Sequence, residues 1–338
     1  MTMAAGRSFA RWRLVLGLAW TLLPQTAWSA DTGEPLVLER RIALEDVGGR
    51  IDHMAVDLRG HRLFVAELGN DSVDVIDLGS GTVLHRFAGL KSPQGVTYVP
   101  APDAIAIANA GDGSVHFYDG SGFAALGTLN LGNDADNARV DVRTGDLVIG
   151  YGDGGLAVVD PATRSKRQDV ALPGHPESFQ IDPRANRAYI NVPDAGQIAV
   201  MDLTAGRQVA KWTVPGQAEN FPMAIDNAGG TLATVFRSPP RLVLLNSETG
   251  AVTGSYPTCA DADDVFFDAR RHRIYVSCGA GAIDVFSRDG RGAQFLATVH
   301  TSAGARTSLF VPELDRLYVA ERAGLLKDAA ILVFRPAP

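Results

Sequence analysis

The chain has 338 residues, 46% of them hydrophobic, with 31 Lys plus Arg against 38 Asp plus Glu and a formal net charge of −7. Because non-specific nucleic-acid binding depends on lysine and arginine, this acidic composition with four lysines leads us to expect no nucleic-acid partner. The length suits one large all-β domain, and no Pro/Ser-rich linker divides it.

Residues 1–30 predict a secretory signal peptide. A basic segment with Arg7, Arg11 and Arg13 precedes the apolar run "LVLGLAWTLL" at 14–23, and small residues follow. The apolar run has about ten residues, well short of the roughly twenty that cross a bilayer, so no membrane span is expected. Cleavage after Ser29 and after Ala30 both remain open. Removal of 1–30 leaves 28 basic and 38 acidic residues, and we expect a periplasmic or secreted domain at 31–338.

The exported part begins with one unmatched β-rich run, "LVLERRIAL" at 36–44, and continues as seven repeats. The repeats start at similar short runs, spaced 41 to 44 residues apart. These runs are "IDHMAVD" (51), "PQGVTYV" (93), "ADNARVD" (135), "PESFQID" (176), "AENFPMAID" (218), "ADDVFFD" (262) and "ARTSLFV" (305). A fixed period of this length indicates a repeat architecture.

Each start is followed by two further β-rich runs separated by turns, such as "RLFVAEL" (62) and "SVDVIDL" (72), and six repeats add a fourth, more polar run. The seventh repeat ends at Pro338 without a fourth run. Four-stranded units repeated around an axis form a β-propeller, and closing the ring protects its edges. We therefore predict an all-β, seven-bladed β-propeller of four-stranded antiparallel blades in which 36–44 completes the last blade.

Units such as "RLFVAELGNDSVDVIDLGSGTVLHRF" resemble the YVTN-repeat family of seven-bladed β-propellers, and the resemblance covers essentially all of 31–338. It implies an exported or surface propeller, often without an assigned reaction. The literal Tyr-Val-Thr-Asn sequence is absent from every copy.

An acidic phrase occurs twice, as "DADNARVD" at 134–141 and "DADDVFFD" at 261–268, 127 residues apart. The first strand of a propeller blade is innermost, so the beginnings of these strands surround one mouth of the central channel. The second residue of each start forms a predicted ring: Asp52, Gln94, Asp136, Glu177, Glu219, Asp263 and Arg306. The next positions form a second ring: His53, Gly95, Asn137, Ser178, Asn220, Asp264 and Thr307.

Carboxylates gathered at one mouth need a compensating cation, because they raise one another's pKa. Carboxylate and amide oxygens suit Ca²⁺ or Mg²⁺, and the predicted metal ligands are Asp136, Glu177, Glu219 and Asp263. The predicted ligand-binding residues are Asp52, Gln94, Asn137, Ser178, Asn220, Asp264 and Arg306. A small polar or cationic ligand, or merely a wet channel entrance, remains an alternative to the metal.

His53 and His175 are the histidines expected at this mouth, where a neutral imidazole is able to act as a general base. They are the catalytic candidates if the protein resembles metal-dependent propeller lactonases or lyases. Glu67, Arg237 and Glu321 are expected further out on the rim. No haem, quinone or nucleotide motif is present, and Trp212 is the one tryptophan after residue 30. The preferred interpretation is a monomeric binding or scaffolding protein with an unknown protein or small-molecule partner.

The far ends of the first strands carry a recurrent aspartate that we interpret as structural, because Asp commonly binds the backbone of its own turn. These residues are Asp57, Asp141, Asp182, Asp226 and Asp268. Cys259 and Cys278 are the only cysteines. In an oxidising compartment we expect them to form a disulfide, with two buried thiols as the alternative.

Overall fold

The computed structural model describes residues 1–2, 33–290 and 292–338. The chain divides into two units, Met1–Gly33 and Glu34–Pro338. The predicted signal peptide lies almost wholly in 3–32, outside the described residues. Among the described residues there is no helix with the length and apolarity to cross a membrane.

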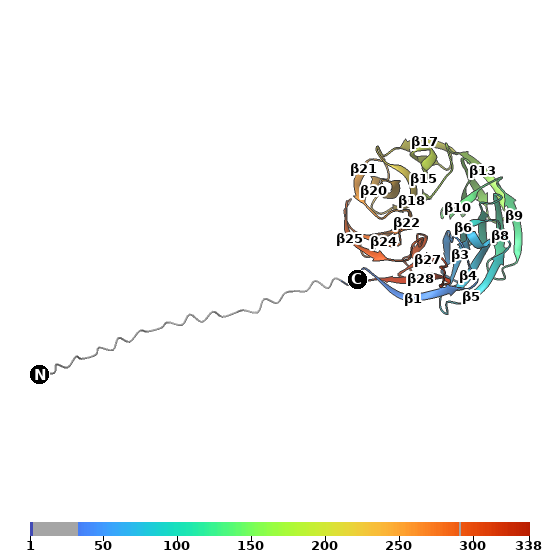
Figure 1. Ribbon diagram of the computed structural model, residues 1–338. Helices are drawn as coiled ribbons and strands as arrows, with labels where there is room; N and C mark the ends of the chain where they lie inside the picture. Colours follow the sequence, from blue (N-terminus) through green and yellow to red (C-terminus); the bar gives the residue numbers. More distant parts are fainter. Residues whose placement is uncertain (3–32, 291) are drawn as a thin grey trace. The chain divides into compact units, whose positions relative to one another are not determined.

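The described part of Glu34–Pro338 forms seven antiparallel sheets of four strands each, arranged in a ring (Figure 1), which confirms the predicted seven-bladed propeller. The innermost strands are β2 (Met54–Asp57), β6 (Pro93–Val99), β10 (Ala135–Val140), β14 (Phe179–Asp182), β18 (Ala218–Asp226), β22 (Ala262–Asp268) and β26 (Ser308–Val311). The second strands are β3 (Arg62–Glu67), β7 (Ala104–Asn109), β11 (Leu147–Tyr151), β15 (Arg187–Val192), β19 (Thr231–Ser238), β23 (Arg273–Cys278) and β27 (Arg316–Glu321).

The third strands are β4 (Ser72–Asp77), β8 (Ser114–Asp119), β12 (Gly155–Asp160), β16 (Gln197–Asp202), β20 (Pro240–Asn246), β24 (Ala282–Asp289) and β28 (Ala329–Pro336). The outer strands are β5 (Val83–Ala88), β9 (Ala125–Asn130), β13 (Ser165–Ala171), β17 (Arg207–Trp212), β21 (Val252–Pro257), β25 (Gly292–His300) and β1 (Leu36–Leu44). Two short 3₁₀ helices, η1 (Leu68–Asn70) and η2 (Pro193–Ala195), follow β3 and β15.

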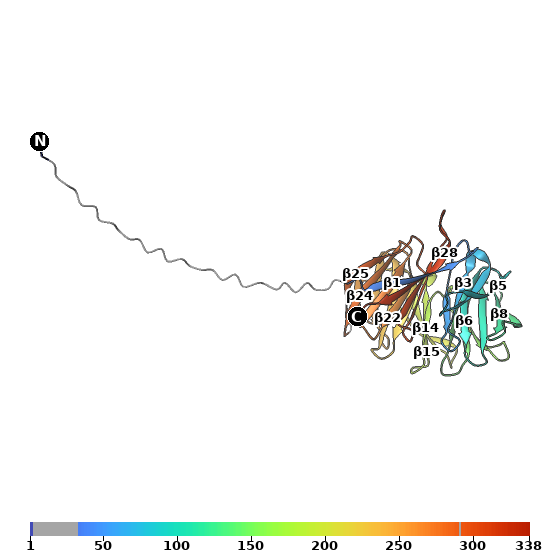
Figure 2. The same cartoon turned by 90° about the horizontal axis from the view of Figure 1, so that it is seen from below.

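Closure of the ring depends on β1, which pairs antiparallel with β28 from Leu36 opposite Pro336 to Leu44 opposite Ala329. The first and last parts of the domain therefore share one blade, as predicted, and β1 runs alongside β28 in both views (Figures 1 and 2). The side chain of Ile42 is 3% exposed, so the strand is held by packing as well as by its ladder.

The hydrophobic core lies between neighbouring blades rather than at the axis. Every residue of β7 is buried, whereas most residues of the outer strand β9 are exposed. Middle strands are covered on both faces, so they are nearly continuous apolar runs. One such cluster joins Phe64 and Val73 of the first blade to Val96 and Ile105 of the second.

The two ends of the innermost strands differ. At one end, the recurrent aspartates accept backbone N–H bonds from residues two or three positions later, which confirms their structural role; they are Asp57, Asp141, Asp182, Asp226 and Asp268. At the other end the ladder of four blades is interrupted, between Pro93 and Gly95, Ala135 and Ala138, Asn220 and Met223, and Ala262 and Asp264. Such bulges re-aim side chains. Three of them fall at the predicted ring positions Gln94, Asp136 and Asp263, whereas the bulge of the fifth blade falls beyond them, at Phe221 and Pro222.

Candidate functional site

A cavity of about 270 Å³, here called the mouth cavity, lies where the starts of the innermost strands meet. Most of the residues predicted for this end line it: Asp52, His53, Gln94, Asp136, Asn137, His175, Glu177, Ser178, Arg237, Asp263 and Arg306. Arg50, Asp134 and Phe221 line it as well and were not predicted. The repeat alignment therefore locates a real concentration of charged side chains.

Several predicted residues lie elsewhere. Glu219 is exposed, has a left-handed φ of 63°, and is not among the lining residues. Asn220 is buried, and its amide nitrogen donates to Asn191 Oδ1 at 2.8 Å. Asp264 lies deeper along the axis and lines a second cavity.

Glu67 and Glu321 are both buried rather than placed on the rim. Ser72 Oγ donates to Glu67, and burial together with the charge of Asp74 raises the pKa of Glu67 to about 8. Glu321 instead pairs with Arg41 of the closing strand at 3.1 Å. Both residues therefore belong to the packing of their blades.

The first acidic pair, Asp134 and Asp136, holds two histidines. His175, from the loop before β14, donates Nδ1–H to Gly152 O at 2.7 Å and lies 3.5 Å from Asp134 Oδ2. Its Nε2 lies 3.8 Å from Asp136 Oδ2, while His53 Nε2 lies 3.4 Å from Asp136 Oδ1. Asp136 is thus placed between two imidazoles that come from different blades.

The second acidic pair, Asp261 and Asp263, holds two arginines in the same way. Arg306 Nη1 lies 2.6 Å from Asp261 Oδ1, and its Nε lies 3.1 Å from Asp263 Oδ2. Arg237 Nη2 lies 2.6 Å from Asp263 Oδ1, and the guanidinium stacks 3.7 Å from the ring centroid of Phe221. In both copies the following blade supplies one cation, and another blade supplies the second.

The two copies also share a backbone turn. Asp134 and Asp261 have left-handed φ values of 43° and 59°, which Asp tolerates better than most residues. Their carbonyls accept N–H bonds from Gly152 at 3.0 Å and Gly279 at 2.8 Å. A Cβ at Gly279 would lie 1.9 Å from Asp261 Oδ2, so a larger residue there would displace the Asp261 carboxylate. The repeated phrase therefore encodes a turn after which Asp136 and Asp263 line the mouth cavity, joined in the first copy by Asp134.

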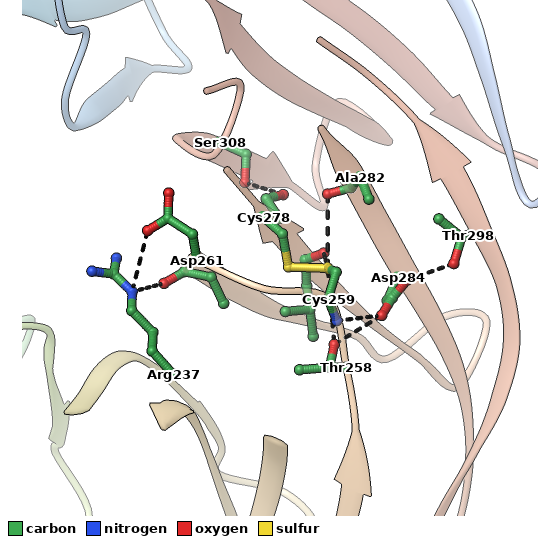
Figure 3. The surroundings of a disulfide bond; sticks show 12 residues. Arg237, Thr258, Cys259, Asp261, Cys278, Ala282, Asp284, Thr298 and Ser308 are labelled. Atoms are coloured by element: carbon green, nitrogen blue, oxygen red, sulfur yellow. Dashed lines mark hydrogen bonds and ion pairs between the residues drawn. A yellow bond between two sulfur atoms is a disulfide. The ribbon is translucent and has the colours of Figure 1, made fainter. Parts of the chain in front are cut away.

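A disulfide joins Cys259 and Cys278 near Asp261 (Figure 3), which confirms the predicted bridge. It ties the loop before β22 to the end of β23. The backbone N–H of Cys259 also donates to Asp284 Oδ2 at 2.7 Å. Because Asp261 follows Cys259 by two residues, the bridge fixes the segment that carries it.

Both histidines at the mouth are cationic at neutral pH. Burial lowers the pKa of His53 and of His175, but hydrogen bonding to Asp136 and nearby carboxylate charge raise it further, to about 9 in each. Burial raises the pKa of Asp136, yet its bonds to the two imidazoles bring the net value well below the usual range. A general base needs a neutral imidazole, so these pKa values suit ion pairing instead.

Asn137 shows how His53 is accommodated. Its Nδ2 lies 2.8 Å from His53 Nε2, an arrangement that suits a neutral ring, whereas its Oδ1 has no hydrogen-bond partner among the described residues. A protonated His53 needs an acceptor at Nε2. The nearby carboxylates of Asp52 and Asp136 favour a protonated His53. We therefore assign His53 as the charged imidazolium and the Asn137 amide in the flipped orientation, in which its oxygen accepts the Nε2–H of His53.

Glu177 is the carboxyl group of this cavity that lacks a partner: no side chain of the described residues pairs with it or donates a hydrogen bond to it. Burial and the charge of Asp136 raise its pKa to about 7. Burial also raises the pKa of Asp52 to about 6, although His53 and Arg50 lower it. Protonation of both groups therefore changes close to neutral pH.

The mouth cavity carries nearly balanced charge. Arg50, Arg237, Arg306 and the two histidines face the carboxyl groups of the lining, so the compensating cations come from the protein. Of the predicted metal ligands, Asp136 and Asp263 are engaged by cationic side chains, Glu177 is unpaired, and Glu219 lies outside. In the described part of the chain, no three His, Cys, Asp or Glu side chains are grouped as a metal site. The Ca²⁺ or Mg²⁺ site remains a prediction.

Sequence reasoning missed part of this site. Asp134 and Asp261 open the repeated phrase, so its recurrence was itself a signal for them. Arg50 stands two residues before the ring position Asp52, where no repeat marks it. Phe221 occupies the cavity because the fifth start, "AENFPMAID", is two residues longer than "ADNARVD".

No protein-family model and no curated protein matches the sequence. Solved structures do match in fold. A chain of Kuenenia stuttgartiensis hydrazine synthase superposes with a TM-score of 0.76 at 15% identity, covering 86% of this chain and 97% of that one. A chain from the crystal structure of a mitotic checkpoint complex gives 0.75 at 14% identity, covering 95% and 98%. At these identities the likeness establishes the β-propeller fold alone.

Proposed function

We propose that this protein is an exported binding propeller whose mouth cavity takes a small polar ligand bearing both an ammonium group and a carboxylate. The observation that carries the proposal is Glu177, an unpaired carboxyl group in a cavity whose other charges are matched. Export is supported by residues 1–30, by the YVTN-like repeats and by the Cys259–Cys278 bridge, which suits an oxidising compartment.

The ammonium end of the ligand pairs with Glu177. A half-buried carboxylate without a partner is costly to desolvate, and a cationic donor removes that cost. Gln94 and Ser178 line the same cavity and offer side-chain oxygens to the remaining N–H groups.

The carboxylate end of the ligand pairs with arginine. A guanidinium has five N–H donors, and Arg306 commits only its Nη1 and Nε to the second acidic pair. Arg237 and Arg50 line the same cavity. A zwitterion preserves the charge balance of the cavity, which explains why acids and bases are combined there.

A divalent metal ion is a less favoured ligand for the mouth cavity, because cationic side chains already surround its carboxylates. Two arginines and two protonated histidines already surround Asp136 and Asp263, and a divalent cation at either carboxylate meets their repulsion. The same protonation makes His53 and His175 unsuited to accept a proton at neutral pH, as a lactonase-type mechanism would require.

Thermal unfolding with matched probes tests the proposal. 4-Aminobutyrate carries both charges, whereas butyrate and butylamine carry one each. A ligand that binds the folded state raises Tm, so 4-aminobutyrate should raise Tm at concentrations at which butyrate, butylamine and CaCl₂ do not. An increase with CaCl₂ alone would favour the metal site, and the absence of any increase with 4-aminobutyrate would overturn the proposal.

A further inference from the structure

A second cavity of about 470 Å³, here called the channel cavity, continues along the innermost strands. His53 lines both cavities, so it lies between the mouth and the channel, whereas Asp264 lines the channel cavity. The channel cavity has a different character, because it is lined mainly by apolar side chains.

One equivalent position of each innermost strand is among the residues that line the channel cavity. In six blades this position is uncharged: Ala55, Thr97, Gln180, Ala224, Phe266 and Leu309. In the third blade it is Arg139. A single cationic side chain therefore projects into an otherwise uncharged ring.

Arg139 has no ion-pair partner within 4 Å in the described residues, unlike the arginines of the mouth cavity. Its Nη1 donates to Ala138 O at 3.2 Å, and its guanidinium lies 5.7 Å from the ring centroid of Phe179. The polar neighbours are already engaged: Thr97 donates to Ala138 O at 2.9 Å and Gln180 donates to Met223 O at 2.8 Å.

Asp264 forms no close ion pair with Arg139 and acts on it only through its charge at longer range. Its Oδ2 accepts the backbone N–H of Ser308 at 2.6 Å. Burial and the charge of Asp263 raise its pKa to about 8, so it is neutral at pH 7. Burial lowers the pKa of Arg139, and the more distant charges of Asp264 and Asp136 offset this only in part.

Placing an unpaired guanidinium in an apolar channel costs stability, and apolar replacements of buried charges often stabilise proteins. Leu309 shows that this ring accommodates an apolar side chain at the equivalent position. The presence of arginine at 139 therefore needs a reason other than packing, and an anionic ligand supplies one.

We propose that the channel cavity binds a small carboxylate with an apolar body, held by its carboxylate at Arg139. Arginine binds carboxylates through two parallel N–H···O bonds, and Phe266 and Leu309 offer the apolar surface for the body of the ligand. This site is distinct from the mouth cavity in position, charge and ligand class.

Calorimetric titration of the purified protein with benzoate tests this site, with benzyl alcohol and benzylamine as neutral and cationic analogues of the same size. Benzoate should bind, whereas the two analogues should bind at least about tenfold more weakly. Arg139→Gln should weaken benzoate binding at least tenfold. Arg207→Gln, which removes the same charge from an exposed position on β17, should leave it unchanged.

Arg139→Leu separates folding from binding. Without ligand its Tm should equal or exceed that of the unmodified protein, and benzoate should no longer raise it. Benzoate that does not bind, that binds Arg139→Gln as tightly as the unmodified protein, or that loses affinity in Glu177→Gln would each overturn the proposal. The mouth cavity is judged independently, because 4-aminobutyrate binding should survive Arg139→Gln.

Discussion

Arg306 Nε lies 3.1 Å from Asp263 Oδ2, an ion pair that joins the last blade to its neighbour at the edge of the mouth cavity. Asp263 also holds Arg237, and both arginine side chains are 15% exposed. The pair therefore sits between surface and core, where loss of one partner leaves the other poorly solvated.

Replacement of Asp263 with asparagine should lower the free energy of unfolding by about 2 kcal/mol, because two largely buried guanidinium groups lose their shared carboxylate. Asp261→Asn should cost less than about 1 kcal/mol, since the side chain of Asp261 is 46% exposed. Urea denaturation of both variants measures the difference, and equal effects would argue against the central position of Asp263.

The free energy of unfolding should fall as pH rises through the range in which His53 and His175 lose their protons. Their pKa is raised from 6.5 to about 9, so their stabilising contribution is complete below pH 6.5 and is lost as pH rises through 9. The raised pKa values of Glu177 and Asp264 act in the same direction.

Tm measured from pH 6.5 to 9.5 should therefore decrease, and the decrease should be smaller in the double variant His53→Gln, His175→Gln. His300→Gln is the control, because His300 is exposed at the end of β25. A double variant with the slope of the unmodified protein would contradict the proposed protonation of the mouth histidines.

Removal of the disulfide should lower both the stability of the fold and the affinity of the mouth cavity for its ligand. Cys259 and Cys278 are separated by 19 residues, and a bridge of this span contributes about 3 kcal/mol. Cys259→Ala with Cys278→Ala should lower the unfolding free energy by that order. It should also reduce 4-aminobutyrate affinity, because Asp261 is no longer fixed. Unchanged affinity would show that the bridge serves the blade alone.

Closure of the ring can be tested within β1 by a pair of aliphatic truncations. Ile42→Ala should cost about 3 kcal/mol, because Ile42 is 3% exposed and packs in the core cluster of the first and last blades. Leu38→Ala in the same strand should cost less than about 0.5 kcal/mol, because Leu38 is 51% exposed. Equal costs in thermal unfolding would mean that β1 pairs with β28 without contributing to the core.

The blades were predictable because each repeat has a recognisable local sequence pattern. The apolar runs and turns identify four strands per unit, and the missing fourth run after Pro336 identifies β1 as its replacement. These features depend on short stretches of chain, so the 41 to 44 residue spacing was sufficient.

The site was only partly predictable because its partners come from different blades. Asp136 and Asp263 were identifiable from the repeated phrase, but nothing local to "DADD" indicates that Arg237 lies 2.6 Å away. Strand bulges determine which of the other predicted ring residues reach the cavity. In the fifth blade the ladder shifts between Asn220 and Met223, which places Phe221 in the cavity and leaves Glu219 exposed.

Glu177 and Glu219 give the sharpest comparison, since both occupy the predicted ring and only Glu177 lines the mouth cavity. Titration calorimetry with 4-aminobutyrate at pH 8, where Glu177 is ionised, measures the central claim directly. The unmodified protein and Glu219→Gln should bind equally, and Glu177→Gln should bind at least about tenfold more weakly, the loss of one charge-assisted hydrogen-bonded pair. Equal binding by Glu177→Gln, or no binding by the unmodified protein, would contradict the account.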